Sequence, residues 1–301
     1  MLWGCRRPVM ALGMHTVLLF YKYVTVIEPQ KYADVLRIKA EELRLAGRIL
    51  VAEEGLNGTV EGLTEHAEAF AQFLLSDSRF ADMQIKRSLG NGKAFRTMKV
   101  KVRNEIVGTR FPKEVDPRVR TGKHVQPSVV RSWFETGDDF TIIDMRNSYE
   151  FASGRFKGSI DPGIQNSRDL PEKMAQLHPY KHKKVLTVCT GGVRCEKMSA
   201  FLLEQGFSDV YQLDGGMHSY MEQYPGEDFE GTLYTFDNRV VMNFGGNRTI
   251  VGKCSYCGAH TERYVNCKSD ACKAHYVACE QCAAYDRARN CVQCEAKTVS
   301  V

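Results

Sequence analysis

The 301-residue sequence lacks the features that would place it in several special classes of protein. It contains no apolar stretch long enough to span a bilayer, no long internal repeat and no low-complexity segment. Its 43% hydrophobic and 26% charged residues exclude a disordered chain. What is left is a globular protein long enough for two or three domains.

The N-terminus also lacks a complete export signal. An apolar stretch, Val9–Tyr21, follows two arginines, but no small-residue cleavage site comes after it and Lys22 interrupts it. We therefore expect a cytoplasmic protein that does not bind a membrane. Residues 1–13 are expected to form a disordered extension. The sequence has no flavin, haem or nucleotide motif.

Cysteine, by contrast, is abundant, with eleven in the chain. Eight of them form four closely spaced pairs near the C-terminus: Cys254 and Cys257, Cys267 and Cys272, Cys279 and Cys282, Cys291 and Cys294. In a reducing compartment such clustering indicates metal binding rather than the alternative of two to four disulfides.

Short gaps let both thiolates of a cysteine pair reach one tetrahedral ion, so eight ligands suffice for two structural zinc sites. We expect a zinc-ribbon-like region over residues 227–301. The spacing does not decide between sequential and cross-braced pairing. It also leaves His260 and His275 open as substitute ligands.

Hydrophobic periodicity predicts an α/β protein whose first domain covers residues 14–110. Residues 17–24 and a pair within residues 48–62 are expected strands, and Pro29–Ala46, closed by Gly47, is an expected helix. A second helix begins at Thr64, and further strands follow. The order β-α-β-β-α-β indicates a ferredoxin-like or acylphosphatase-like sandwich.

Residues 111–126 are expected to be a linker. In residues 127–226, strands alternate with helices, which implies a parallel sheet. The chain then becomes polar and rich in cysteine.

The net charge of +5 is concentrated in one segment. Residues 86–123 hold twelve Lys and Arg against three acidic residues. Lys99, Lys101 and Arg103 alternate with apolar residues and would share one face of a strand. That face is either solvated or a phosphate-binding surface for a nucleic acid. The candidate RNA-binding residues are Lys86, Arg87, Lys99, Lys101 and Arg103.

The segment VLTVCTGGVRCEK carries the candidate reactive group. Cys189 ends an apolar strand, where open α/β sheets place their active sites. The residues that follow, with two glycines, predict an anion-binding nest at a helix N-terminus: Thr190, Gly191, Gly192 and Val193. With Arg194 beside it, the Cys189 thiol should have a lowered pKa and ionise near neutral pH. The alternative is that Cys189 is a buried structural cysteine, which would be unreactive. Cys195 is either an auxiliary thiol or a packed helix residue.

The loop spacing bears on the reaction class. Cys-x4-Arg is one residue shorter than the loop of cysteine phosphatases and resembles the six-residue loop of rhodanese-type sulfurtransferases, whose cysteine carries a persulfide. Two neighbouring segments resemble the rhodanese signatures that flank this loop. They are DMRNSYEFASGRFKGSI (Asp144–Ile160) and DVYQLDGGMHSY (Asp209–Tyr220). Arg155 departs from that pattern, since rhodanese domains usually have His there.

Across residues 16–294 the chain resembles the oxygen-dependent tRNA uridine hydroxylases. The segments that carry the resemblance are, in order, VLLFYKYV, GRILVAEEGLNGTV, CTGGVRCEKMSAFLLEQGF, YTFDNR and the cysteine-rich tail. The resemblance implies hydroxylation of wobble uridine at C5, with tRNA as partner, molecular oxygen as cosubstrate and Cys189 as the catalytic cysteine. One alternative is a sulfurtransferase that passes a persulfide to an acceptor. Another is a non-enzymatic interaction module.

Overall fold

The computed structural model describes residues 14–111, 115–245, 249–269, 272, 274–284, 290–292 and 294. The predicted extension at residues 1–13 lies outside these ranges. The chain divides into two compact units, Met1–Ile106 and Val107–Val301. In the ranges that the structure describes, no helix has the length and apolar character needed to cross a membrane.

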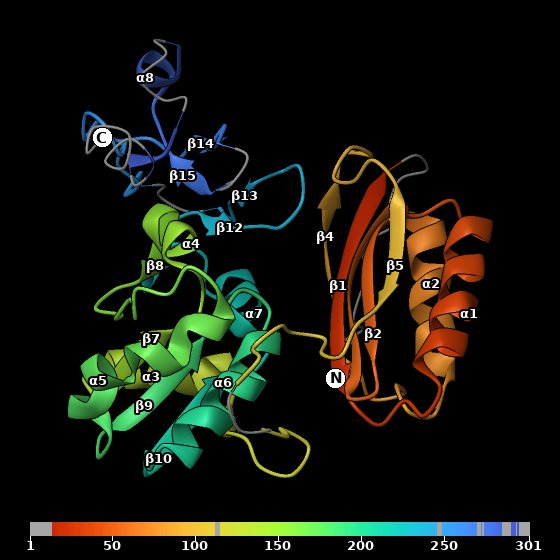
Figure 1. Ribbon diagram of the computed structural model, residues 1–301, viewed down its shortest axis with the longest axis horizontal. Helices are drawn as coiled ribbons and strands as arrows, with labels where there is room; N and C mark the ends of the chain where they lie inside the picture. The colour runs from red at the N-terminus through yellow and green to blue at the C-terminus, as the bar shows by residue number, and fades with distance from the viewer. Residues whose placement is uncertain are drawn as a thin grey trace, which may run out of the picture. The chain divides into compact units, whose positions relative to one another are not determined.

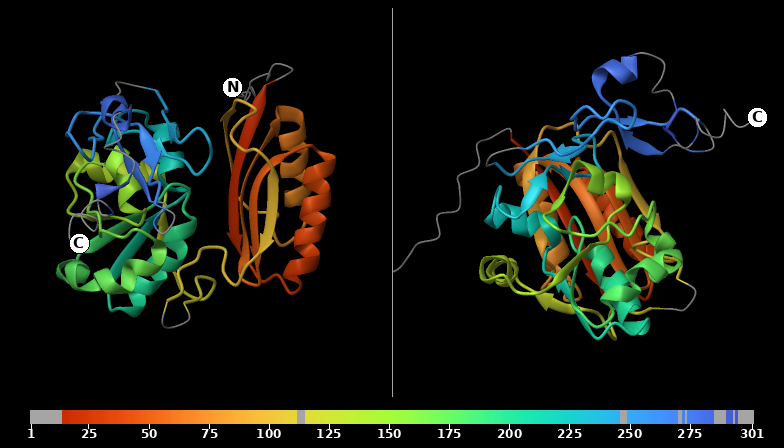
Figure 2. Two further views of the ribbon diagram at one scale, coloured as in Figure 1. Left: turned by 45° about the horizontal axis from the view of Figure 1, so that its top comes forward. Right: turned by 90° about the vertical axis from the view of Figure 1, so that its left-hand side faces the viewer.

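The first unit is a five-stranded sheet with two helices on one face (Figures 1 and 2). The strand order is β4-β1-β3-β2-β5, and every neighbouring pair is antiparallel except β2 and β5. The elements are β1 (His15–Tyr23), α1 (Pro29–Glu42), β2 (Ala46–Ala52), β3 (Gly55–Leu63), α2 (Thr64–Ser76), β4 (Ile85–Gly90) and β5 (Met98–Val102). This arrangement confirms the predicted ferredoxin-like sandwich, to which β5 adds an edge strand.

Apolar side chains at helical spacing hold the two helices on the sheet. Phe70 and Leu74 of α2 are fully buried beside Leu36 of α1. The predicted end of the first helix is wrong, because α1 stops at Glu42 and Arg44 takes the left-handed conformation at φ +51°. Gly47 instead lies in β2, where a Cβ would stand 2.3 Å from the carbonyl oxygen of Thr59.

The second unit is built on a parallel sheet in the order β6-β10-β9-β7. The elements of this part are β6 (Lys123–Val125), α3 (Pro127–Thr136), β7 (Thr141–Asp144), α4 (Ser148–Ser153), β8 (Gly154–Phe156), η1 (Ser167–Lys173), α5 (Met174–Leu177), η2 (His178–Tyr180), β9 (Lys184–Val188), α6 (Val193–Glu204), β10 (Asp209–Leu213) and α7 (Gly216–Gln223). Alternate residues of β9 enter different cores, since Val185 packs with α6 residues and Leu186 with α7 residues. The predicted parallel sheet is confirmed.

The end of the expected linker belongs to this sheet. Residues 123–125 form β6, which pairs with β10. The Gln212 side chain of β10 donates to the carbonyl of Gly122 at 2.9 Å, and the Thr121 hydroxyl donates to the carbonyl of Glu196 at 2.8 Å. These polar contacts hold the segment at the edge of the sheet. The prediction of a linker is wrong here, because the glycine and charged residues of the segment gave no apolar pattern typical of a strand.

The C-terminal part of the second unit consists of short elements. They are β11 (Phe229–Gly231), β12 (Leu233–Tyr234), β13 (Val241–Met242), β14 (Tyr264–Asn266), β15 (His275–Val277) and α8 (Glu280–Ala284). Strand β11 pairs with β8, where Arg155 lies 3.5 Å from the Glu230 carboxylate and over the Phe151 ring. Strands β12 and β15 pack against α4 (Figure 1).

Candidate functional site

Cys189 lies directly after β9, at the carboxyl end of a strand flanked on both sides by other strands. The chain turns at residues 190–192, and α6 begins at Val193. The turn needs a glycine because Gly192 has φ +103°, and its N–H points at the Cys189 sulfur at 3.2 Å. The predicted strand, loop and helix around this cysteine are confirmed.

The N-terminal turn of α7 holds the loop from outside. Backbone N–H groups of Met217 and His218 donate to the carbonyls of Cys189 and Thr190 at 2.9 and 3.0 Å. Gly216 allows this approach, because a Cβ there would stand 2.6 Å from the Gly192 nitrogen. With its carbonyls engaged on one side, the loop turns its N–H groups inward to the sulfur, as a nest requires.

Arg194 reaches the same loop but does not bring an unpaired charge. Its guanidinium makes a two-point ion pair with Glu150, at 2.6 and 2.9 Å, and donates to the Thr190 hydroxyl at 3.2 Å. Glu150 is fully buried, and Arg194 is 8% exposed. Sequence reasoning missed Glu150. Its local signal is a capping box with Asn147, which marks the start of a helix and gives no sign of Arg194.

The loop stabilises a thiolate at Cys189. Burial of the side chain raises its pKa, but a hydrogen bond from the Cys195 thiol, the charge of Arg194 and the N–H groups of both residues outweigh it. The resulting pKa is about 6. The pKa of Cys195 is raised instead, by burial and by the neighbouring Cys189. At neutral pH the anion therefore resides on Cys189.

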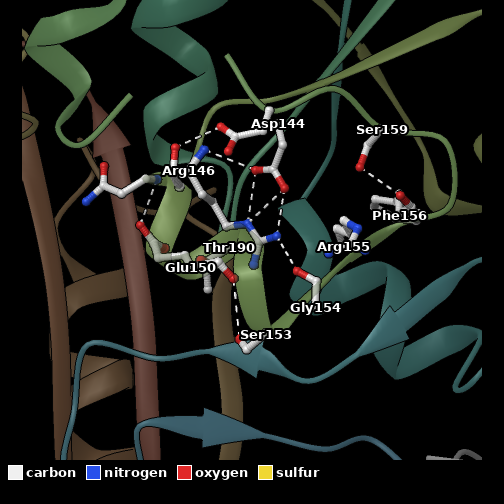
Figure 3. A network of polar contacts seen from close by, with 12 residues as sticks. Asp144, Arg146, Glu150, Ser153, Gly154, Arg155, Phe156, Ser159 and Thr190 are labelled. Atoms are coloured by element: carbon white, nitrogen blue, oxygen red, sulfur yellow. Dashed lines mark hydrogen bonds and ion pairs between the residues drawn. The ribbon is translucent and has the colours of Figure 1, made fainter. Parts of the chain in front are cut away.

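A second buried ion pair supports the helix that carries Glu150 (Figure 3). Asp144, the last residue of β7, accepts from the Arg146 guanidinium at 2.7 and 3.0 Å, and neither side chain is exposed. Arg146 also donates to the carbonyl of Gly154 at 2.6 Å. The pair thus joins the end of β7 to the end of α4, with Glu150 between them in the sequence.

The structure does not bring the five candidate RNA-binding residues together. Lys99 and Lys101 are exposed on β5, whose apolar residues face the helices, and Arg103 continues the pairing with β2. Lys86 and Arg87 lie on β4, at the opposite edge of the sheet. Lys86 is 7% exposed, beside the Tyr21 ring, and Arg87 pairs with Glu68 of α2.

The cysteine-rich tail gathers its eight thiols into two groups of four. One group is Cys254, Cys257, Cys279 and Cys282, and the other is Cys267, Cys272, Cys291 and Cys294. The first and third pairs along the chain thus meet, as do the second and fourth, which is the cross-braced alternative. Neither group includes His260 or His275: His260 lies against the Ile250 carbonyl and His275 against the Tyr234 hydroxyl.

The spacing of the thiols fits a tetrahedral metal ion. The four sulfurs of each group lie within 4.8 Å of one another, and the Cys257–Cys279 and Cys272–Cys291 sulfurs are 3.7 and 3.6 Å apart. Sulfurs bound at about 2.3 Å to a tetrahedral zinc ion are separated by about 3.8 Å. The tail also contacts α4, since the Tyr264 hydroxyl donates to the Tyr149 carbonyl at 2.6 Å.

Protein-family models agree with this architecture. Three family models match the chain: the UPF0176 acylphosphatase-like domain over residues 15–106, the rhodanese-like domain over residues 126–223 and the rhodanase C-terminal region over residues 230–296. A solved rhodanese-like domain from an Anabaena species is 20% identical with a TM-score of 0.32, covering 47% of this chain and 100% of that one.

Curated relatives match nearly the whole chain. A tRNA uridine(34) hydroxylase from Cytophaga hutchinsonii is 44% identical over 89% of this chain and 86% of that protein. Proteins of the same name from Staphylococcus carnosus and Bacillus velezensis are 38% and 43% identical, over 91% and 86% of this chain and 92% and 81% of theirs.

Proposed function

Because the chain belongs to the tRNA uridine(34) hydroxylase family, we propose that it modifies tRNA by hydroxylating C5 of the wobble uridine to 5-hydroxyuridine, with molecular oxygen as oxidant. In this proposal Cys189 is the nucleophile and Arg194, with the loop N–H groups, stabilises its thiolate. The observation that carries the assignment is the environment of Cys189, in which the Cys195 thiol, the charge of Arg194 and the N–H groups of both residues lower its pKa to about 6. Because the proposed substrate is tRNA, we also propose that the protein acts in the cytoplasm.

A thiolate is suited to activating a uracil ring. Its sulfur adds to C6, and the electron pair released onto C5 attacks molecular oxygen. The peroxide anion that forms takes a proton from solvent to give a hydroperoxide at C5. Two electrons and two protons from a thiol reductant convert the distal oxygen to water. Loss of the C5 proton and of the Cys189 sulfur then restores the C5–C6 double bond and leaves 5-hydroxyuridine.

Access to the sulfur requires movement. Cys189 has no exposed surface, so a uracil ring reaches it only after covering side chains shift. A uridine in an anticodon loop is already partly unstacked, which lowers the cost of presenting it to a buried group.

The direct test is nucleoside mass spectrometry of a wobble-uridine tRNA incubated with the protein and a thiol reductant. With ¹⁸O₂ the product should carry one labelled oxygen at C5, and under nitrogen no product should form. Unlabelled 5-hydroxyuridine from ¹⁸O₂ would rule out molecular oxygen as the source. Thiolated uridine in place of 5-hydroxyuridine would favour the sulfurtransferase alternative.

We further propose that Lys99, Lys101 and Arg103 hold tRNA phosphates. Lys99 and Lys101 lie on β5, and Arg103 follows its last residue with its N–H still bonded to the Val51 carbonyl of β2. Strand β2 also brings Arg48 opposite Lys99 in register. A row of cations on a sheet face attracts the RNA backbone without reading its sequence. Lys86 and Arg87 are omitted from this surface because they lie at the other edge of the sheet.

Changing Lys99, Lys101 and Arg103 to Glu together should weaken tRNA binding on the order of 100-fold near 0.1 M salt, because each lost phosphate contact removes counterion release. The measurement is a binding titration at several salt concentrations, where the salt slope should fall by about 2 to 3. The control changes three α1 cations, Lys31, Arg37 and Lys39, to Glu, which alters the net charge equally. Equal weakening by both triples would contradict a local binding surface.

The two cysteine groups are proposed to hold structural zinc. All-thiolate tetrahedral sites favour zinc and stabilise small domains that lack a large core. We expect elemental analysis of anaerobically purified protein to give two zinc ions per chain, and Cys257→Ser to give about one. Serine at Cys189, which lies outside both groups, should leave two. Metal-free protein with an intact tail would refute the sites.

A further inference from the structure

Phe236 stands out because its ring is exposed. It is 58% exposed, and no other phenylalanine, tyrosine or tryptophan among the residues that the structure describes is exposed to solvent in this way. Single exposed apolar residues are common and need no special account. The surroundings of this ring, however, place it beside the Cys189 loop on a rigid support.

The turn that presents Phe236 is held by its own hydrogen bonds. The N–H of Thr235 donates to the Val240 carbonyl at 2.8 Å, and that of Val240 to the Asp237 carbonyl at 2.9 Å. The Asp237 carboxylate is 2% exposed and accepts from the backbone N–H, Nε and Nη2 of Arg239 at 2.9, 2.9 and 2.6 Å. A ring on such a turn is already oriented before a ligand arrives.

The ring also borders the catalytic loop. The guanidinium carbon of Arg194 lies 5.5 Å from the Phe236 ring centroid, and Tyr234 packs edge-on at 5.2 Å. Arg194 in turn contacts Thr190, the residue after Cys189. One side of the ring therefore lies against Arg194 at the reactive loop, and the other side is exposed to solvent.

We propose that Phe236 is a positioning residue on which a nucleobase of the tRNA anticodon loop, next to the reacting uridine, stacks. The inference rests on the proposed function. Every base offers a flat face, and stacking on aromatic side chains is how proteins hold unpaired nucleotides. A base held here keeps its neighbour close to Cys189.

The test uses Phe236→Leu, which keeps apolar bulk without a ring, and Phe236→Trp, which keeps stacking. The probe is an anticodon stem-loop with 2-aminopurine at position 33 or 35, whose fluorescence is quenched by stacking. We expect the wild type and the Trp variant to quench one of the two probes under nitrogen, and the Leu variant not to. KM for tRNA should rise about 5- to 100-fold in the Leu variant, from the usual energy of one base–aromatic stack, with kcat changed less.

Controls separate stacking from a structural role. Val119→Ala removes another exposed apolar side chain, 84% exposed, and should leave KM and quenching unchanged. The rate at which iodoacetamide alkylates Cys189 should be the same in the Leu variant as in the wild type, showing an intact loop. A Leu variant with wild-type KM and quenching overturns the inference, as does a wild type that hydroxylates tRNA but quenches neither probe. A wild type that neither binds nor hydroxylates tRNA would instead refute the proposed function.

Discussion

Replacing Cys189 with Ser should abolish uridine hydroxylation, lowering kcat/KM by at least about 10³-fold, as removal of a nucleophile does in other enzymes. A serine hydroxyl at this position would not ionise near pH 7, so it cannot add to C6 of the uracil ring. The measurement is 5-hydroxyuridine formed per enzyme under air. A variant that keeps more than a tenth of the wild-type activity would remove Cys189 from the mechanism.

Cys195 supplies the matched control, since it is equally buried and only six residues away. Cys195→Ser keeps a hydrogen-bond donor beside Cys189 and should retain most of the activity. Cys195→Ala removes that donor, so the pKa of Cys189 should rise above about 6. If Cys195→Ser is as inactive as Cys189→Ser, then Cys195 is a second reacting thiol rather than a packed residue.

A persulfide on Cys189 gives a different pattern. It would add 32 Da to the resting protein in mass spectrometry, and Cys189→Ser would lose thiosulfate-to-cyanide sulfur transfer. Thiolate addition to uracil predicts instead a covalent adduct with RNA that contains 5-fluorouridine, since fluorine at C5 blocks the final elimination. The two intermediates are therefore separable on the same variant.

The sequence predicts the local elements well, because their evidence is local. Apolar spacing predicted α2 through residues such as Phe70 and Leu74, and the strand, glycines and helix around Cys189 all lie within some twenty residues. The Cys189 loop could be predicted for the same reason: a nest is made of consecutive residues.

Pairings between distant residues were beyond sequence reasoning. Glu150 meets Arg194 across 44 positions, and nothing in either segment alone identifies the partner. The basic residues show the same limit. Lys86 and Arg87 are adjacent, yet on a strand they point to opposite faces, and the sheet order then puts both far from Lys99. The cross-braced tail likewise depends on how the chain folds back, which cysteine spacing does not record.

The Glu150–Arg194 pair should control both stability and reactivity. Glu150→Gln removes a buried carboxylate and leaves Arg194 charged without a full partner, so the free energy of unfolding should fall by about 3 kcal/mol, at the low end for a broken buried pair because Gln still accepts one hydrogen bond. The loss of a negative charge near the thiolate favours ionisation. The pKa of Cys189 should therefore drop below about 6.

Two measurements check these opposite effects. Denaturant unfolding reports the stability, and the pH dependence of alkylation by iodoacetamide reports the thiolate, with its midpoint expected lower in Glu150→Gln and higher in Arg194→Met. The matched control is Glu135→Gln, which breaks a surface pair between Arg131 and a 58% exposed Glu135, and should cost less than about 1 kcal/mol without moving the midpoint. Midpoints equal to that of the wild type in both Glu150→Gln and Arg194→Met would mean that Arg194 and Glu150 stabilise the fold but do not set the charge of Cys189. Such a result would leave the helix N-terminus, the Cys195 thiol and the loop N–H groups as the source of the lowered pKa.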